Sequence, residues 1–266
     1  MLVSVIIATY NRSAELKRAI ESVLAQTYSD YELIVIDDCS TDDTEDIVGK
    51  FEDKRIKYKK LSKNSGGSFV PRCIGLKVAT GEYIAILDDD DYWVDRYKLI
   101  LQTLYLWGHP ESVMVGTDAI TCNGGNSMVI HHHYPRTHIE IKNKILMHNC
   151  FYHSSVMYRK ETCLAIGGYH VIKSGYYKNF IDEYELWLRM GLKGELINLP
   201  IYGVGHSCPC GNLRLKDRIC LMISHVILIN KYKEYYPHYL KANIFRLVII
   251  ILELPLLIKI KNIARK

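Results

Sequence analysis

Four short strand-like stretches, separated by helical patterns, constrain the fold of this chain more than any other feature. Most of them are nearly continuously apolar, which is typical of strands buried on both faces of a sheet. Strand, helix, strand, helix, strand, helix, strand is the order of a sheet with right-handed crossovers. We therefore predict an α/β fold with a mainly parallel sheet flanked by helices. The stretches are residues 2–8, 33–36, 56–61 and 83–87.

Polar side chains follow the first, second and fourth of these stretches. They are residues 9–11, Asp37 with Asp38, and the run Asp88 to Asp91. Because parallel strands end at one edge of a sheet, these side chains should form one site there. Four adjacent carboxylates repel one another and are rarely placed together for stability. Their oxygen atoms suit Mg²⁺ or Mn²⁺, which often bridge to substrate phosphates.

The acidic run has one alternative interpretation, and two other classes of nucleotide-binding enzyme are disfavoured. By itself, the acidic run also fits a solvated turn before a helix that starts near Asp95. The chain has no G-x-G-x-x-G after the first strand and no G-x-x-x-x-G-K-[ST], which disfavours dinucleotide oxidoreductases and P-loop enzymes.

Several ordered motifs resemble those of glycosyltransferase family 2. They are VIIATYNR at 5–12, ELIVIDDCSTD at 32–42, Asn64-x-Gly66, Arg72-Cys73-x-Gly75 and GEYIAILDDDD at 81–91. The resemblance is strong over residues 2–118 and patchier to about 206. It implies the GT-A nucleotide-diphospho-sugar transferase fold.

The resemblance implies roles for individual residues in the first half. Ala8, Thr9 and Tyr10 would hold the nucleotide base, with Tyr10 stacking on it. Asp38 would accept a hydrogen bond from uracil or ribose, and Arg72 would approach the base or the diphosphate. In the acidic run, Asp88 would contact the ribose, Asp89 is an additional nucleotide-side carboxylate, and Asp90 would bind Mn²⁺ or Mg²⁺. The role of Asp91 is left open.

A second acidic pair, Asp182 and Glu183, opens a helical pattern near residues 180–189. The helix dipole alone favours acidic residues in a first turn. The resemblance implies instead that the second member of the pair, Glu183, is the general base, and Asp182 is the alternative base. It also implies that His206 contacts the diphosphate or the metal, although a loop histidine is equally expected to be solvated.

The rest of the second half gives weaker predictions. Residues 122–136 are expected to form a loop, and Pro200 is expected to confine the strand at 196–204 to a sheet edge. The eight cysteines are scattered and no signal peptide precedes the first strand, so we predict reduced thiols in a cytosolic protein. His206-x-Cys208-x-Cys210 lacks a second ligand pair at zinc-site spacing and is interpreted as a loop.

The charge distribution divides the chain. Residues 213–266 hold eleven basic and three acidic residues, whereas the remainder is slightly acidic. An anionic partner is therefore expected for this tail. Because the tail is also apolar, we predict a helix that lies in the cytoplasmic leaflet of a membrane, with no nucleic acid partner. The resemblance implies that this membrane is a bacterial inner membrane. A core helix or a homo-oligomer interface is the alternative.

Taken together, the sequence predicts a domain at 1–212 and a helical basic-apolar region at 213–266. The domain comprises a nucleotide-sugar half (1–118) and an acceptor half (119–212). The predicted activity is inverting, metal-dependent transfer of a hexose, glucose or galactose in β linkage, from a UDP-sugar. The resemblance implies a lipid-linked acceptor such as GlcNAc-diphospho-undecaprenol, in O-antigen or capsule synthesis. A nucleotidylyltransferase and a catalytically silent scaffold are the alternatives.

Overall fold

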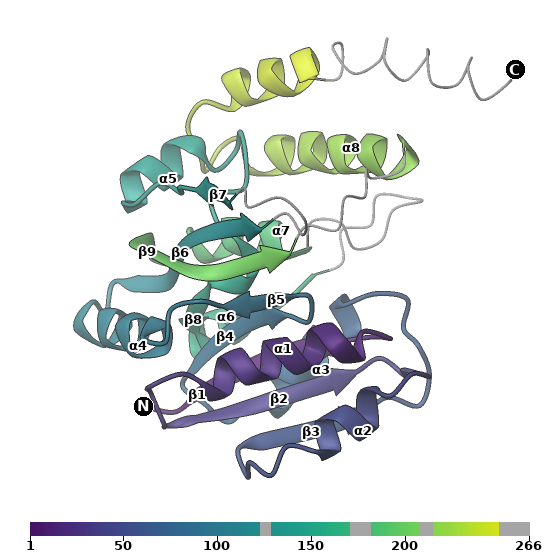
Figure 1. The fold of residues 1–266 in the computed structure, drawn as a ribbon. Helices are drawn as coiled ribbons and strands as arrows, with labels where there is room; N and C mark the ends of the chain where they lie inside the picture. The colour runs from purple at the N-terminus through teal and green to yellow at the C-terminus, as the bar shows by residue number, and fades with distance from the viewer. Residues whose placement is uncertain (123–128, 171–181, 208–214, 250–266) are drawn as a thin grey trace, which may run out of the picture.

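The computed structural model describes residues 1–122, 129–170, 182–207 and 215–249. One sheet runs through the molecule, with helices on both faces (Figure 1). Its first half has the predicted strand–helix alternation. The elements are β1 (Val3–Thr9), α1 (Ser13–Leu24), β2 (Tyr31–Asp37), α2 (Thr44–Gly49), β3 (Ile56–Lys60), α3 (Phe69–Val78) and β4 (Tyr83–Asp88).

The second half adds strands to the same sheet rather than building another one. The strand order is β3-β2-β1-β4-β8-β6-β9-β5, with β7 paired to β6. The elements are β5 (Asp91–Trp93), α4 (Lys98–Gly108), β6 (Ser112–Cys122), β7 (Val129–His132), α5 (His138–Lys144), the 3₁₀ turn η1 (His153–Ser155), β8 (Met157–Arg159), α6 (Lys160–Ala165), α7 (Asp182–Met190), β9 (Glu195–Ser207) and α8 (Leu215–Tyr232).

The prediction of a mainly parallel sheet is correct for the first half, whereas the second half mixes parallel and antiparallel pairs. Strands β1 to β4 pair in parallel. The pairs β4–β8, β6–β8, β6–β7 and β5–β9 are antiparallel. The β6–β9 pair is parallel, so the sheet as a whole is mixed. The predicted loop at 122–136 contains one of these strands, β7.

The prediction that Pro200 confines its strand to an edge is also wrong. Strand β9 lies between β6 and β5. The register of β6 against β9 jumps from Thr117↔Leu199 to Asp118↔Tyr202, so Pro200 falls in an irregularity of the ladder. A proline lacks the N–H that a regular ladder needs, and a bulge removes that requirement.

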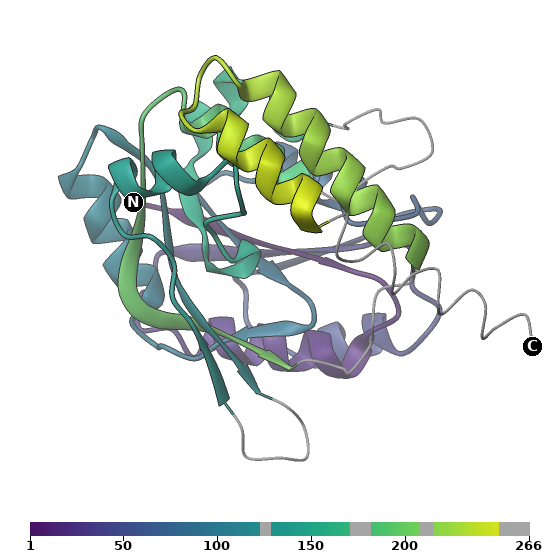
Figure 2. The ribbon, with the colours of Figure 1, turned by 90° about the horizontal axis from the view of Figure 1, so that it is seen from above.

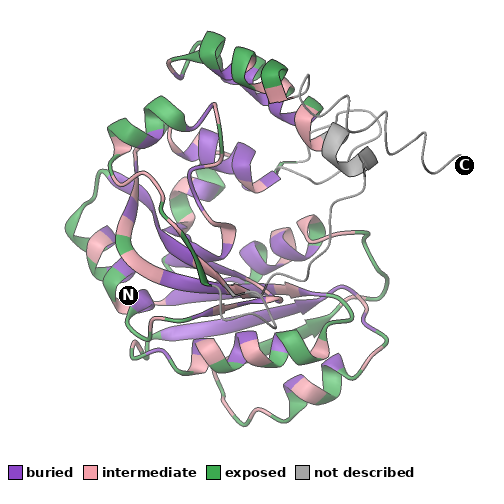
Figure 3. Ribbon diagram, turned by 45° about the horizontal axis from the view of Figure 1, so that its top comes forward, coloured by how far each residue is buried: buried purple, intermediate pink, exposed green. Residues whose placement is uncertain are grey.

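Two apolar layers enclose the sheet. Alternate residues of β1 point to opposite faces: Val5 and Ile7 pack with the core under α1 and α4, whereas Ile6 packs with the core under α3 and α7. Burial on both faces explains why these strands read as continuous apolar runs. The buried strands contrast with the exposed outer sides of the helices in Figure 3.

The described part of the basic-apolar region packs on the second half of the domain. Helix α8 is followed by a helix at 239–249, and the two lie side by side (Figure 2). Tyr232 Oη and Lys231 Nζ each donate to the buried carboxylate of Glu185 on α7, at 2.6 and 2.7 Å. Arg246 donates to the Met147 carbonyl. Residues 250–266 lie outside the described ranges.

Glu32 joins four strands at the end of the sheet opposite the acidic run. Its carboxylate accepts hydrogen bonds from Ser4 on β1, Lys57 on β3, and Thr80 just before β4. Burial raises the pKa of this group, but the hydrogen bonds from Lys57, Ser4 and Thr80 outweigh it and lower the pKa to about 2. The stabilisation is complete above the unfolded-state pKa and is lost as the pH falls toward 2.

We predict that Glu32→Gln lowers the free energy of unfolding at pH 7 by about 1–3 kcal/mol, because buried hydrogen-bonding groups lose their charged partner. The variant should also lose less stability than the wild type between pH 4.5 and pH 2. Urea unfolding at a series of pH values measures both effects. Glu21→Gln, on the exposed side of α1, is the control. Parallel pH dependence in the Glu32 variant and the wild type would refute this account.

Candidate active site

A pocket of about 590 Å³ opens at the carboxyl ends of β1, β2 and β4. The polar residues that follow these three strands were predicted to share one sheet edge, and they do. Loop residues 64–68 and the start of α3 close the remaining side. The lining residues are Ala8, Thr9, Tyr10, Arg12, Asp38, Asn64, Gly66, Gly67, Ser68, Pro71, Arg72, Asp88, Asp89 and Asp90.

Hydrogen bonds hold the β1–β2 side of the pocket together, and one aromatic ring projects from it. The Asp38 backbone N–H donates to the Thr9 carbonyl at 2.9 Å. The Asp38 carboxylate accepts from the backbone N–H and the hydroxyl of Ser65. These bonds attach the 64–67 loop, which turns through Gly66 at φ +86°. Tyr10 remains 45% exposed, so its ring is available to a planar ligand.

Arg72, from α3, binds the first carboxylate of the acidic run. Its Nη2 donates to Asp88 Oδ1 at 2.8 Å. Burial would raise the pKa of Asp88, but the Arg72 charge outweighs it and lowers the pKa. The Asp88 backbone N–H donates to Ser154 Oγ at 3.0 Å, which fixes the end of β4. Asp88 is thus an ionised group that faces the pocket.

Arg12 forms ion pairs with the next two carboxylates, Asp89 and Asp90. Its Nη1 lies 2.9 Å from Asp89 Oδ1 and 2.7 Å from Asp90 Oδ2. Burial raises the pKa of Asp89 to about 6, and the Arg12 charge opposes that rise. The sequence motifs implied no role for Arg12. Its adjacency to the acidic run comes from the turn after β1, which places residues 77 positions apart in contact.

The fourth carboxylate, Asp91, points away from the pocket. It accepts hydrogen bonds from Tyr152 Oη at 3.1 Å, from Ser154 Oγ, and from His206 Nδ1 at 2.7 Å. Its strand β5 pairs with β9, in the register Asp91↔His206. The hydrogen bond to Asp91 is the largest cause of the raised pKa of His206. Asp91 therefore orients His206, and this explains a carboxylate whose role the sequence left open.

The acidic pair at the start of α7 reaches the same site through Arg72. Arg72 Nη1 lies 3.7 Å from both Asp182 Oδ2 and Glu183 Oε2. The Glu183 side chain is 23% exposed, whereas that of Asp182 is 2% exposed. Burial and the Asp182 charge raise the pKa of Glu183 to about 8. A carboxylate with a pKa near neutrality is a suitable general base or acid.

The described residues contain no group of three histidine, cysteine or acidic side chains arranged to hold a metal. The donor set still fits a hard divalent cation. Mg²⁺-type ions are commonly held by one or two carboxylates together with substrate phosphates and water. Asp90, whose side chain is 31% exposed at the pocket, is such a carboxylate. The His206-x-Cys208-x-Cys210 motif lies partly outside the described residues.

The α/β fold thus has a polar pocket at one sheet edge, with an acidic pair beside Arg72. Residues 4–164 match the model of glycosyl transferase family 2, and the chain belongs to that family. The GT-A-type fold implied by the resemblance is confirmed. Family membership also favours a glycosyltransferase over the nucleotidylyltransferase alternative.

Two curated relatives from Escherichia coli are both named UDP-Glc:alpha-D-GlcNAc-diphosphoundecaprenol beta-1,3-glucosyltransferase. WfaP is 50% identical over 93 residues, which is 35% of this chain and 37% of WfaP. WfgD is 40% identical over 130 residues, 48% of this chain and 49% of WfgD. The matched regions thus cover between about a third and a half of the length of these two relatives.

A solved structure of Staphylococcus aureus TarS residues 1–349 with UDP-GlcNAc has the same fold. Its TM-score to this chain is 0.67 at 20% identity, covering 92% of this chain and 70% of that one. The Pyrobaculum calidifontis mannosyltransferase PcManGT, solved with GDP-Man and Mn²⁺, gives a TM-score of 0.65 at 18% identity, covering 92% and 69%.

We predict that Arg12→Gln raises the pKa of Asp89 above about 6, because the variant removes the cation that opposes the effect of burial. The carboxyl ¹³C shift of Asp89, followed against pH in metal-free protein, measures this change. Lys17→Gln removes one positive charge from exposed α1 and is the matched control. An unchanged midpoint for Asp89 in the Arg12 variant would contradict the assignment of this ion pair.

Proposed function

We propose that the protein transfers a hexose from a UDP-sugar to a hydroxyl of a lipid-linked saccharide, with inversion at the anomeric carbon. The observation that carries this proposal is Arg72. One buried guanidinium contacts both a carboxylate of the nucleotide pocket and the acidic pair on α7. Donor-binding and base-bearing groups therefore lie within one site, as a single displacement requires.

The pocket supplies the contacts that a uridine nucleotide needs. Tyr10 would stack on the base above Ala8 and Thr9, and Asp38 would accept a hydrogen bond from uracil or ribose. Asp88 would accept from the ribose hydroxyls, with Asp89 beside it. Arg72 would lie toward the diphosphate. Asp90, with His206 oriented by Asp91, would hold a divalent cation, Mn²⁺ or Mg²⁺. That cation would offset charge on the departing nucleoside diphosphate.

Glu183 is proposed as the general base because it is the more accessible of the acidic pair. It would take the proton of the acceptor hydroxyl while the acceptor oxygen bonds to the anomeric carbon. The bond from that carbon to the diphosphate oxygen breaks on the opposite side, which inverts the configuration. Asp182 is the alternative base. In the present geometry its negative charge raises the pKa of Glu183 and strengthens Glu183 as a base.

The donor and acceptor are proposed from the relatives. WfaP and WfgD are named for UDP-glucose and GlcNAc-diphosphoundecaprenol. We infer a β-linked glucose or galactose and an acceptor of that lipid-diphosphate class, in O-antigen or capsule synthesis. TarP, a poly(ribitol-phosphate) beta-N-acetylglucosaminyltransferase, is 44% identical over 110 residues, 40% of this chain and 32% of TarP. UDP-GlcNAc therefore belongs in the donor screen.

The test is UDP release from UDP-glucose, UDP-galactose and UDP-GlcNAc with Mn²⁺, with and without GlcNAc-diphospho-lipid. We predict that Glu183→Gln lowers kcat by about 100-fold or more, as expected for loss of a general base, while UDP affinity is kept. In the wild type, kcat/KM should rise with pH through about 8, because the base must be deprotonated. Asp182→Asn should move that rise to lower pH by removing the neighbouring charge.

Asp90→Ala is the companion variant and should abolish metal-dependent UDP binding. Full activity of Glu183→Gln together with an inactive Asp182→Asn would show that Asp182 is the base. If the wild type releases no UDP from any donor in the presence of acceptor, the proposed function is wrong.

A bilayer surface is proposed as the location of the enzyme. No helix in the described ranges is long and apolar enough to span a membrane. The helix at 239–249 nevertheless turns an apolar face to solvent: Leu240, Ile244 and Leu247 are 61%, 62% and 59% exposed. Their spacing places them on one side of the helix. Lys241 is exposed and follows Leu240 directly in the chain, so a cation beside this face would favour an anionic, cytoplasmic leaflet.

We predict that Leu240→Gln combined with Ile244→Gln lowers binding to phosphatidylglycerol vesicles by about tenfold or more, because two apolar side chains no longer enter the bilayer. Sedimentation of the full chain with vesicles measures the loss. Leu101→Gln combined with Leu104→Gln, on exposed α4, is the matched control. Equal losses in both double variants, or none in either, would exclude this face as the membrane contact.

A further inference from the structure

A cluster of buried polar atoms next to the pocket has no hydrogen-bond partner within the described part of the chain. It comprises both ring nitrogens of His153, both carboxylate oxygens of Asp182, and Nε of Arg72. Buried polar atoms are nearly always hydrogen-bonded in folded proteins, because an unpaired one costs about 1–3 kcal/mol. Five such atoms in one place indicate a site built for a hydrogen-bonding ligand.

The cluster extends from the edge of the pocket to the acidic pair, of which Asp182 is a member. Arg72 and Asp88 line the pocket. His153, on η1, has its Nε2 at 3.8 Å from Asp88 Oδ1, and Asp182 lies 3.7 Å from Arg72. Both separations are longer than hydrogen bonds. The groups are close enough to share a small polar ligand and too far apart to satisfy one another.

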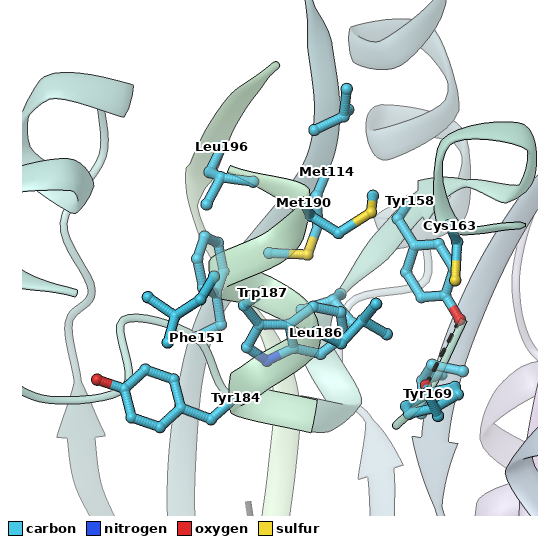
Figure 4. Close-up of a cluster of buried hydrophobic side chains, with 14 of the residues drawn as sticks. Met114, Phe151, Tyr158, Cys163, Tyr169, Tyr184, Leu186, Trp187, Met190 and Leu196 are labelled. Atoms are coloured by element: carbon cyan, nitrogen blue, oxygen red, sulfur yellow. Dashed lines mark hydrogen bonds between the residues drawn. The ribbon is translucent and has the colours of Figure 1, made fainter. Parts of the chain in front are cut away.

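His153 is the member of the cluster with the most specific chemistry. Its side chain is 9% exposed, and its ring lies 5.9 Å from that of Trp187, centroid to centroid. Trp187 itself lies in the core cluster shown in Figure 4, which limits movement of the imidazole. Burial and the Arg72 charge lower the pKa of His153 to about 4. At neutral pH the ring therefore presents one donor and one acceptor nitrogen.

We propose that His153 recognises the transferred sugar, by hydrogen-bonding a hydroxyl group of the donor hexose beside Asp88 and Asp182. A hydroxyl group both donates and accepts, as a neutral imidazole does. This inference rests on the proposed function and deepens it, because the same site that binds the UDP group would read the hexose through a residue that the sequence motifs did not mark. Sites that hydrogen-bond a substrate hydroxyl discriminate strongly against analogues that lack it.

The position of His153 separates sugar recognition from nucleotide binding. The groups proposed for uracil and ribose, Tyr10 and Asp38, lie on the β1–β2 side of the pocket. His153 lies beyond Asp88, on the side of α7 and Glu183. Loss of the imidazole should therefore weaken contacts to the hexose and leave contacts to UDP unchanged.

The experiment compares wild type, His153→Phe and His153→Gln as full-length chains. Calorimetry with Mn²⁺ measures affinity for UDP and for the UDP-hexose that the wild type turns over. We expect His153→Phe to bind UDP within twofold of wild type and the UDP-hexose about tenfold or more weakly, the equivalent of one lost hydrogen bond. His153→Gln, which keeps a donor and an acceptor, should recover part of the loss.

A series of deoxy-hexose donors identifies the contacted hydroxyl. In the wild type, removal of that hydroxyl should lower affinity about tenfold, and in His153→Phe the same removal should have no further effect. The inference is overturned if UDP and UDP-hexose affinities fall equally, which would indicate a structural role beside Asp88. It is also overturned if every deoxy penalty is the same in both proteins. Absence of UDP binding by the wild type would instead overturn the proposed function itself.

Discussion

The site depends on one buried guanidinium. Arg72 comes from α3, binds Asp88 at the end of β4, and faces Asp182 and Glu183 at the start of α7. Without that cation, these three carboxylates would lie near one another and lose the guanidinium charge that they share, which would raise their pKa values and destabilise the fold. The cation therefore permits an acidic site, and it makes the two halves of the domain electrostatically interdependent.

The mixed sheet supplies the geometry for this arrangement. The parallel half brings the ends of β1, β2 and β4 to one edge, where the pocket proposed for the nucleotide forms. Antiparallel β8 continues the sheet from β4 and carries η1 up to Asp88. His153 and the acidic pair thus both lie beside residues that line the pocket. A donor and an acceptor could meet there without a large movement of the fold.

The sequence was most informative where the chemistry was local. Continuous apolar runs predicted β1, β2 and β4, and the polar residues after them predicted the site edge. Pairings between distant residues were not predictable: Arg12 with Asp89, Asp91 with His206, and β9 between β6 and β5 arise only in the folded sheet. His153 was missed because a single histidine beside two serines has no pattern. His153 becomes a candidate only in the folded structure, where both of its ring nitrogens are buried without a hydrogen-bond partner among the described residues.

The pairing of β5 with β9 has a consequence for how the enzyme is made. Asp91 and His206 are 115 residues apart, yet they are direct partners in the ladder. During synthesis, the first four strands leave the ribosome long before β9 does, and domains tend to fold as units during synthesis. The acidic turn therefore lacks its last support until translation has passed residue 207. A nascent or truncated chain could form the nucleotide half and still have no finished active site.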